Sequence, residues 1–560
     1  MNNQDIKKRF NAIEAERRSS VEQLWDLIER FVLPFRGDFY QSLNSEHEVD
    51  WHRRDIYDST AVFAVQSLAA SLQGNLTSPS QKWFDLRFRD PEVAENDKAM
   101  EWLEEVAKRI HEALQDSNFN IEIAEAYIDL CGFGTTVLTE EHKGKDDLVW
   151  SGLNFQALPI REMFFEEDHE KGVWILYRRM QMTAVQLVSQ FGLEGVPQVI
   201  KDGFESVEAA TRRHKVIFAI YPRPDKKNAD TSKPLAAKER PYGHKYILFT
   251  GARTLGEEGG YYEMPAFVGR WRKVAGSRWG HSPASVALAD ILTANQMIEA
   301  MLEAASKNID PTTFANETAL IGDLDLDRGA LNVVNDIDGI RIHESGSRFD
   351  TSMFQLERLQ QSIRSAFYQD QLELKDSPAM TATEVNARME MIQRLIGPTF
   401  GRLQNDILDP LVQRSFNIMY RAGQLPDLPE GLEISQMDIE YTGPLPRAQR
   451  METAQAIDRW TMGLAEKAEI FPDALDLVDV DRAELFKARL MGVPAIAMRG
   501  KEEVKQIREE RQAAQQKQQA IAEAGAAGEA AKAVGEGAEA SGVPPAAIMQ
   551  AVAGGKGGRG

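Results

Sequence analysis

Two helical segments separated by a short irregular stretch set the strongest limit on how this 560-residue chain can fold. Residues 283–308 are rich in Ala, Leu, Met and Glu and predict a helix, which Pro311 closes. A segment rich in Asp and Gly follows at about 309–348, and helix returns over 352–372. Two such helices cannot bury a core alone, so they must pack on other parts of the chain or on other copies of it.

This pattern has two interpretations. In the first, the helices stand side by side around a symmetric ring, in which each copy packs against its neighbours. They are equally an ordinary helical hairpin inside a globular domain, and the pattern alone does not decide between the two.

After the second helix the chain breaks at Lys375-Asp376-Ser377-Pro378. Helix is predicted again from Thr381 to Arg421. Thr381 followed by Glu384 forms a capping box, in which each side chain satisfies a free backbone N–H of the first turn. Gly397-Pro398 predicts a kink near the middle, because proline removes a backbone hydrogen bond and clashes with the preceding turn.

The amino-terminal half predicts a mixed unit. One helix is expected over the first 30 residues and another over 58–76, and short β-rich runs follow from Gly132. The fold class is therefore α+β and predominantly helical. The tail after Gln512 is mostly Ala, Gln, Glu and Gly, which predicts a mobile helix or disorder. Further expected segments are helices at 91–115, 121–130 and 447–511, strands at 83–90, 135–141, 148–159, 163–168, 172–180, 216–224 and 245–251, and an extended stretch at 434–443.

The charge balance limits the possible partners. A formal net charge of −21 argues against a protein that wraps nucleic acid, because neutralising phosphates requires clustered Lys and Arg. An acidic surface can still meet DNA by repelling it, which suits a surface along which DNA slides.

Membrane and thiol chemistry are not indicated. No stretch approaches the roughly 20 apolar residues of a membrane span, and the amino terminus lacks the apolar centre of a secretory signal, so we expect a soluble protein made in a cytoplasm. The single cysteine, Cys131, lies among apolar and glycine residues. A buried, inert thiol is favoured over a reactive one.

A search for catalytic motifs predicts no catalytic residue, metal site or cofactor. The chain has no GxxxxGK[ST] phosphate loop and no HExxH zinc motif, and Gly132-Phe133-Gly134 is interpreted as a turn. The alternating Asp323, Asp325 and Asp327 resemble the start of a calcium loop. Arg328 and Val334 replace the Gly and Glu that this loop requires, so an exposed acidic loop is favoured.

Four blocks in order carry a family resemblance. They are Asp58-Ser59-Thr60 with LAASLQGNLTSPSQKWFDLRF, Arg278-Trp279-Gly280-His281-Ser282-Pro283, Met380-Thr381-Ala382-Thr383-Glu384-Val385, and EYTGPLPRAQR with Gly492-Val493-Pro494. Over residues 1–511 the chain resembles the portal proteins, or head-to-tail connectors, of short-tailed phages (podoviruses). Trp279, His281 and Ser282 depart from the Tyr-Gly-Arg-Gly-Pro of many relatives, whereas Gly280 and Pro283 keep the turn.

The resemblance implies a portal fold with wing, stem, clip and crown, assembling as a ring with a central channel. In the channel, Lys375 of the tunnel loop contacts phosphates transiently or is only a solvated lysine. The implied clip contact with terminase or an adaptor involves Asp323, Asp325, Asp327 and Arg328. The implied parts are the wing 1–282, stem helices 283–308 and 352–372, the clip 309–351, the tunnel loop 373–380 (Lys375, Asp376, Ser377 and Pro378), the kinked wing helix and extended segment 381–444, the crown 445–511, and the tail 512–560, a barrel helix or disordered.

The implied function is a non-enzymatic conduit for double-stranded DNA at the unique capsid vertex of the virion, assembled in the host cytoplasm. Implied partners are further copies of the chain, as a dodecamer, double-stranded DNA, the terminase large subunit, the major capsid and scaffolding proteins, and tail adaptor proteins. Two alternatives stay open from the sequence. One is a phage-encoded, metal-dependent nuclease, and the other is an internal scaffolding or virion protein.

Overall fold

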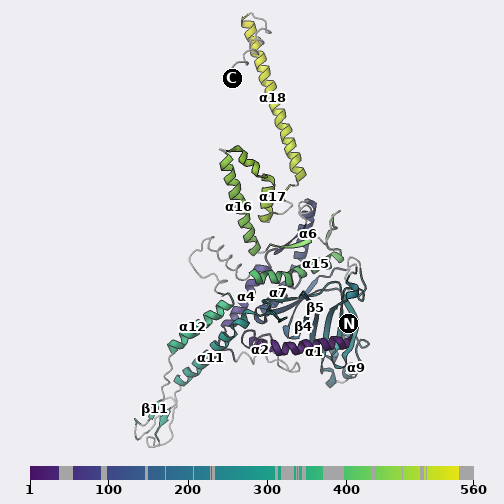
Figure 1. Ribbon diagram of the computed structural model, residues 1–560, viewed down its shortest axis with the longest axis vertical. Coiled ribbons are helices and arrows are strands. Elements are labelled where there is room, and N and C mark those ends of the chain that lie inside the picture. Colours follow the sequence, from purple (N-terminus) through teal and green to yellow (C-terminus); the bar gives the residue numbers. More distant parts are fainter. Residues whose placement is uncertain are drawn as a thin grey trace.

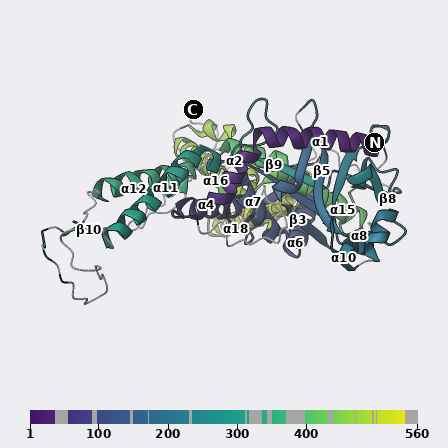
Figure 2. The same cartoon turned by 90° about the horizontal axis from the view of Figure 1, so that it is seen from below.

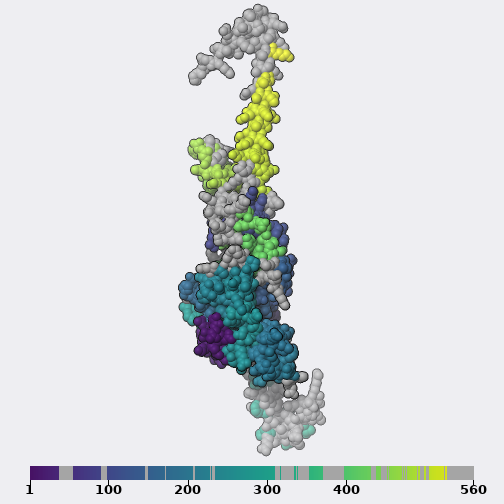
Figure 3. All heavy atoms as spheres, turned by 90° about the vertical axis from the view of Figure 1, so that its right-hand side faces the viewer, coloured from purple at the N-terminus to yellow at the C-terminus, as the bar shows by residue number. Residues whose placement is uncertain are grey.

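The molecule is elongated (Figure 1). A central body contains the sheets, a helical hairpin projects from its lower end, and the long helix α18 (Lys501–Ser541) extends from the other end as a narrow stalk (Figure 3). The structure, a computed structural model, describes residues 1–36, 55–89, 97–144, 149–170, 172–205, 207–227, 229, 234–309, 313–316, 333, 335, 337–338, 340–342, 349–369, 397–429, 437–442, 444–468, 471–491, 493, 497–499 and 501–541.

Two antiparallel sheets form the centre of the body. Their strands are β2 Thr135–His142, β3 Leu153–Leu158, β4 Met163–Glu167, β5 Val173–Thr183, β6 Arg213–Pro222, β7 Tyr242–Leu248, β8 Arg253–Tyr261 and β9 Ala266–Arg270. The larger sheet has the order β4-β5-β6-β7-β8, and the smaller has the order β3-β2-β9. Side chains along β3 mostly alternate between buried and exposed, but every residue of β9 is buried. The smaller sheet is therefore covered on both faces at β9.

Helices from the first quarter of the chain pack around these sheets. They are α1 Asn3–Ser20, α2 Glu22–Phe31, α4 Thr60–Leu76, α6 Asp97–Gln115 and α7 Phe119–Phe133. Helix α7 lies against β2 and β3, and α4 packs on α7 through a face of small and aliphatic side chains that includes Ala61, Ala64 and Leu68. Small side chains at this contact let the two helices approach closely, and one continuous core results.

A second, smaller apolar cluster lies at the outer part of the larger sheet. Two short helices form it with strand residues, and Leu187, Ile200 and Leu255 are fully buried there. Thr183 and Gln186 form a capping box at the start of the first of these helices. The two helices are α8 Ala184–Phe191 and α9 Gln198–Phe204, and the short helix α10 Val207–Ala210 follows them. Short 3₁₀ turns lie at Ile160–Glu162, Pro224–Lys226, Thr250–Ala252 and Pro472–Leu477.

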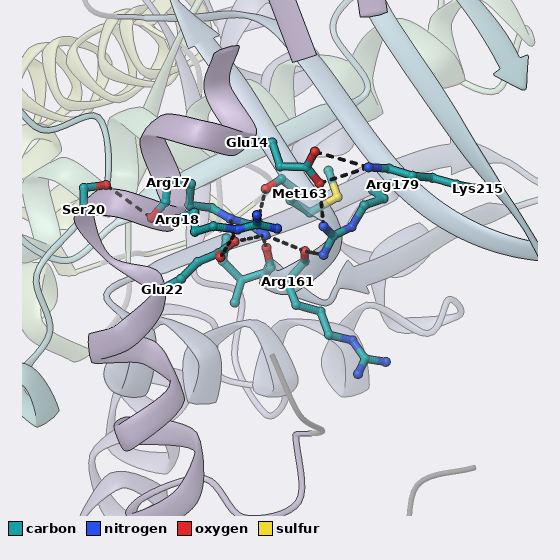
Figure 4. Close-up of polar contacts among 10 residues, drawn as sticks. Glu14, Arg17, Arg18, Ser20, Glu22, Arg161, Met163, Arg179 and Lys215 are labelled. Atoms are coloured by element: carbon teal, nitrogen blue, oxygen red, sulfur yellow. Dashed lines mark hydrogen bonds and ion pairs between the residues drawn. The ribbon is translucent and has the colours of Figure 1, made fainter. Parts of the chain in front are cut away.

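Helix α1 crosses the strands of the larger sheet (Figure 2) and is fastened to it by a buried arginine. Arg17 is fully buried, and its Nε donates a hydrogen bond to Glu22 at 2.8 Å (Figure 4). Its terminal nitrogens donate to the backbone carbonyl oxygens of Ile160 (3.2 Å), Arg161 (3.0 Å) and Met163 (2.8 Å). Burial lowers the pKa of Arg17 to about 10, so the group stays charged at neutral pH.

A second charged group on α1 strengthens this contact. Glu14 accepts hydrogen bonds from Arg179 of β5 (2.8 Å) and from Lys215 of β6 (3.1 Å), as Figure 4 shows. Burial alone would raise the pKa of Glu14, but the two cations outweigh it and lower the pKa. Phe10 packs edge-on against Phe164 at 4.7 Å between ring centroids. The first helix is thus integral to the body.

The carboxyl-terminal half first packs on the body, and its last helices then extend away from it. Strand β12 (Met437–Tyr441) pairs antiparallel with β1 (Phe84–Phe88), with Phe84 opposite Tyr441. Helix α15 (Asp409–Arg421) follows a π-helical turn at Gln404–Leu408 and packs on β2, while that turn contacts β9. Helices α16 (Pro444–Ala468) and α17 (Val480–Met491) then lie between the body and α18 (Figure 1).

Several expectations from the sequence are confirmed. The fold is α+β with helix predominating, and strands or helices occur where the β-rich runs and the helices at 58–76, 283–308 and 121–130 were predicted. Cys131 is buried, and burial raises the pKa of its thiol well above its ordinary value, so it is not a reactive thiolate. No helix among the described residues combines the length and apolar character that crossing a membrane requires.

Other expectations were wrong in detail. The single helix over the first 30 residues is two helices, because the backbone leaves helical geometry at Val21 (φ −128°). Of the helix predicted over 352–372, α12 covers the part up to Ala366 and ends two residues before Tyr368, which adopts φ +59°, and residues 370–372 lie outside the described residues. The turn predicted at Gly132-Phe133-Gly134 begins only at Gly134, since the first two residues are helical. After Gln512, where a helix or disorder was expected, the chain is helical as far as Ser541, which agrees with the first of these alternatives.

Candidate functional site

The helical hairpin that projects from the body is formed by α11 (Pro283–Ile309) and α12 (Phe349–Ala366). The two helices lie side by side in both views (Figures 1 and 2). Ser362 of α12 donates a hydrogen bond to the carboxylate of Asp290 of α11 at 2.7 Å. Beyond the helices the chain forms a short antiparallel ladder of β10 (Thr313–Ala315) and β11 (Ile340–Ile342).

One buried side chain, Asn295 of α11, joins the hairpin to the body. Its Oδ1 accepts hydrogen bonds from the backbone N–H groups of Tyr57 (2.7 Å) and Asp58 (3.2 Å). Its Nδ2 donates to the backbone carbonyl oxygen of Asp55 at 2.9 Å. A single amide thus satisfies three backbone groups of the segment that leads into α4.

The Asp58 carboxylate extends this contact to the second helix of the hairpin. Its Oδ1 accepts hydrogen bonds from the N–H (3.2 Å) and hydroxyl (2.7 Å) of Thr60, and from Gln360 Nε2 of α12 (3.3 Å). Asp58-Ser59-Thr60 was singled out in the sequence as a block of residues. The structure gives it a role, because it links α4 to both α11 and α12.

The turn that enters α11 depends on two glycines in close contact. A Cβ on Gly280 would lie 2.0 Å from the carbonyl oxygen of Gly134, and a Cβ on Gly134 would lie 2.6 Å from that of Gly280. Gly134 has φ +79° and caps α7, a conformation that side chains disfavour. The Gly280 N–H donates to Thr135 Oγ1 at 2.8 Å. Only glycine fits at either position.

The residues that depart from the family pattern in this turn have structural roles of their own. Trp279 is 1% exposed and packs between Trp25 and Phe165, at 5.1 Å and 4.7 Å between ring centroids. Ser282 Oγ accepts a hydrogen bond from the N–H of Ser285 at 3.0 Å, which caps α11. Trp279 and Ser282 therefore both help to hold this turn in place.

The described charges of the hairpin are nearly balanced. Helices α11 and α12 carry five carboxylates and three cationic side chains, a net charge of −2. These residues are Asp290, Glu299, Glu303, Asp350, Glu357, Lys307, Arg358 and Arg364. The acidic balance of the whole chain is therefore not concentrated on these two helices.

Most of the residues that were predicted to form functional sites lie outside the described residues, and their roles stay predictions. They are Lys375, Asp376, Ser377 and Pro378 of the tunnel loop, Asp323, Asp325, Asp327 and Arg328 of the clip, and Thr381 and Glu384 of the helix cap. Gly397 and Pro398 are described and are helical, but residues 381–396 before them are not, so the kink also stays a prediction. The observed irregularity is the π-helical turn at Gln404–Leu408.

Buried carboxylates with raised pKa values were not anticipated, and each has structural partners. Burial raises the pKa of Glu140 to about 8, and its Oε1 accepts a hydrogen bond from the Ser415 hydroxyl at 2.6 Å. Burial raises the pKa of Asp129 to about 7, and Arg36 lies 2.9 Å from it. In the part of the chain that the structure describes, no group of three or more His, Cys, Asp or Glu side chains is placed to hold a metal ion.

The hairpin, its anchor and the body around them lie within a segment that matches a known family. Residues 3–498 match the model of the bacteriophage head to tail connecting protein. The chain belongs to this family. Membership in this family favours neither of the two alternatives, the nuclease or the internal scaffolding protein.

Relatives of this head-to-tail connecting protein are similar along nearly the whole chain. A "probable portal protein" of Bordetella phage BPP-1 is 29% identical over 523 residues, which cover 90% of this chain and 91% of the relative. A portal protein of Salmonella phage epsilon15 is 27% identical over 507 residues, 88% of each chain. A chain from the virion of a native gene transfer agent particle covers 77% of this chain and 94% of its own, at 11% identity and a TM-score of 0.35, too low to add to the argument.

Proposed function

We propose that this protein is a portal subunit, which forms a ring at the unique capsid vertex and conducts double-stranded DNA during packaging and ejection. The family match over residues 3–498 carries the proposal. The two relatives that bear the name portal protein and align over about nine tenths of the chain support it.

Exposed apolar side chains on the helices outside the body also support a ring. Large apolar surfaces are uncommon on monomeric proteins and mark contacts with other chains. Packing against neighbouring copies around a symmetry axis would bury these groups. They are Val286, Leu302 and Ile309 of α11 (72%, 55% and 85% exposed), Met353 and Phe354 of α12 (53% and 65%), Trp460 and Met462 of α16 (50% and 68%), and Phe486 of α17 (50%).

In this proposal the hairpin of α11 and α12 forms the stem around the channel, and the preceding body forms the wing. Residues 309–351 form the clip, 373–380 the tunnel loop, and α16 and α17 the crown. Twelve copies, each with a net charge of −21, would give the ring a formal charge of about −252. Like charges repel DNA over about 8–10 Å in physiological salt, which would keep DNA centred in the channel.

The proposed partners follow from the same assignment. The clip, with Asp323, Asp325, Asp327 and Arg328, would dock the terminase large subunit, which would supply the ATP hydrolysis. Tail adaptor proteins would attach at the same vertex, and the capsid and scaffolding proteins would surround the wing. Assembly would take place in the host cytoplasm and leave the ring in the virion.

The position of the protein in phage particles tests this function. We expect gold-labelled antibody against a carboxyl-terminal tag to mark one vertex per head, the one that carries the tail. Label over the whole shell, or its absence from mature heads, would contradict a portal and would agree with a scaffolding protein.

The tunnel loop offers a second test. We expect Lys375→Ala to leave ring assembly intact and at most to alter DNA packaging or retention, since a single transient phosphate contact holds no subunit in place. Loss of the ring in this variant would rule out the assignment of Lys375 to the tunnel loop.

A further inference from the structure

The helix that ends with α15 contains one turn of a different geometry. Residues 397–403 are α-helical, Gln404–Leu408 form the π-helical turn, and α15 continues from Asp409. At the end of the turn the N–H of Asp409 donates to the carbonyl oxygen of Gln404, five residues earlier. In an α-helix the acceptor would be the carbonyl oxygen four residues earlier. The turn therefore contains one residue more than an α-helical turn.

Pro410 accounts for the position of this turn. In a regular α-helix the N–H of residue 410 would donate to the carbonyl oxygen of Asp406. Proline has no N–H, and its ring clashes with the carbonyl oxygen four residues earlier. The wider π-helical turn relieves this clash. Prolines and π-helical turns are both places where helices bend, so the sequence itself sets a weak point here.

After the turn, α15 is fixed to the body by directional contacts. Arg421 donates hydrogen bonds to both carboxylate oxygens of Glu263, at 2.6 Å and 3.1 Å. Arg414 donates to the backbone carbonyl oxygen of Glu140 at 3.0 Å, and the Ser415 hydroxyl donates to the Glu140 carboxylate at 2.6 Å. The two arginine side chains are nearly buried. Because hydrogen bonds depend on angle as well as distance, these contacts fix both the position and the rotation of α15.

Before the turn, the helix is held in a different way. Phe400 and Leu403 are buried in the apolar core. Among the described residues, no side chain of 397–403 forms a hydrogen bond or an ion pair with the body. Open space surrounds Gly397 and Gly401, and each glycine weakens a helix by about 1 kcal/mol relative to alanine. Apolar contacts are non-directional, so this part of the helix can tilt without breaking a specific bond.

The turn itself lies on strand β9. A Cβ on Gly269 would lie 2.3 Å from Cδ1 of Ile407, so the missing side chain of Gly269 lets the turn approach the strand closely. Arg270, the next residue of β9, donates to the Asp406 carboxylate at 3.5 Å, the outer limit of a hydrogen bond. Its closer contact is with Glu167. The turn is thus located by a close apolar contact and by one weak polar bond.

We propose that the π-helical turn is a hinge, on which residues 397–403 bend as a unit while α15 stays fixed on the sheets. Pro410 and the wide turn make bending easy at this point. Ile407 on β9 is the pivot, and the bond between Asp406 and Arg270 is weak enough to open as the helix bends. The chain that enters this helix can then change direction without disturbing the core. The hinge does not depend on the portal assignment, because all of its parts lie in one chain.

Hydrogen exchange of the full-length protein, followed by mass spectrometry, tests the hinge. Bending opens the backbone hydrogen bonds around the turn, so their amides exchange through a local opening that leaves α15 closed. We expect amides of residues 401–409 to exchange about tenfold or more faster than those of 413–421 in the same helix. Equal exchange rates on the two sides of the turn would overturn the proposal.

Two variants separate a hinge from a helix that is merely weak. Pro410→Ala supplies the missing N–H and permits a regular α-helix, so exchange of 401–409 should slow to within about threefold of 413–421. Gly401→Ala is the matched control, because it also replaces a poor helix former by alanine, in open space, but leaves the turn unchanged. It should keep the difference of about tenfold. Equal slowing in both variants would assign the fast exchange to low helix propensity and overturn the hinge.

Asp406→Asn is a further variant that keeps the test valid if Pro410→Ala does not fold. It removes the charge that attracts Arg270 and leaves the turn and α15 otherwise intact. We expect exchange of 401–409 to become faster, while exchange of 413–421 stays as in the natural protein. Unchanged exchange on both sides of the turn would contradict the role of this bond and overturn the hinge.

Discussion

Asn295 and Asp58 are 237 residues apart in the chain, yet the side-chain oxygen of Asn295 accepts the backbone N–H of Asp58 at 3.2 Å. The same oxygen accepts the N–H of Tyr57 at 2.7 Å. The hairpin is therefore tied to the body by hydrogen bonds to the backbone, which do not depend on salt. If the hairpin is the stem of a portal, this anchor carries force between stem and wing.

Asn295→Ala tests the anchor. The change leaves two N–H groups and one carbonyl group without their partner, and we expect the free energy of unfolding to fall by about 2–4 kcal/mol, since each unsatisfied buried group costs roughly 1–3 kcal/mol. Denaturant unfolding measures the loss. Thr293→Ala, an exposed position two residues earlier on the same helix, should change stability by less than about 0.5 kcal/mol. Equal effects of the two changes would contradict the anchor.

Arg17→Met tests the attachment of α1 to the sheet. It leaves three carbonyl oxygens and Glu22 without their donor, and we expect a loss of about 3–5 kcal/mol, as for a broken buried ion pair. Arg18→Met is the matched control, because the Arg18 side chain is 74% exposed and its ion pair at 3.9 Å is weak. A stable Arg17→Met protein with unchanged thermal unfolding would show that the buried charge is dispensable.

Gly280→Ala tests the contact between the two glycines at the start of α11. The added Cβ would overlap the carbonyl oxygen of Gly134, so the turn must move, and we expect little folded protein in circular dichroism spectra. Gly74→Ala in α4 is the opposite case, because open space surrounds that position. It should raise the free energy of unfolding by about 0.5–1 kcal/mol, the usual gain for Gly to Ala in a helix. Tolerance of Gly280→Ala would contradict the contact.

Glu140 predicts a dependence of stability on pH. Its folded pKa, about 8, lies above its ordinary value of 4.5, so between these pH values the folded state keeps a proton that the unfolded chain has released. Stability therefore falls as pH rises through this window. In the Glu140→Gln variant the side chain is neutral at every pH, and Arg414 and Ser415 still lie beside it. The natural protein loses stability over this window and the variant does not. The free energy of unfolding of the variant, relative to that of the natural protein, should therefore increase from pH 5 to pH 8. A constant difference over this range would contradict a buried, protonated Glu140.

Local patterns predicted much of the secondary structure, because helices and strands follow from periodicity and turn residues. The pairing of β1 with β12 was not predictable, since Phe84 and Tyr441 are 357 positions apart and no local pattern selects the partner of a strand. The break at Val21 was missed because the apolar spacing continues through it.

The contacts at the proposed sites were harder to predict than the elements. Asp58-Ser59-Thr60 stood out as a block, but its partner Asn295 gave no signal, because a lone Asn in a helical run is usually exposed. Arg414 and Arg421 of α15 both donate hydrogen bonds to Glu263, which lies 151 and 158 positions earlier in the chain. No local sequence pattern predicts this contact, because only the fold brings the three side chains together.

Electron microscopy of the purified full-length protein tests the portal assignment most directly. The account predicts rings with a central channel, in which the hairpins of α11 and α12 surround the axis and Val286, Leu302 and Phe354 are buried between neighbouring copies. Compact monomers under all solution conditions would contradict it.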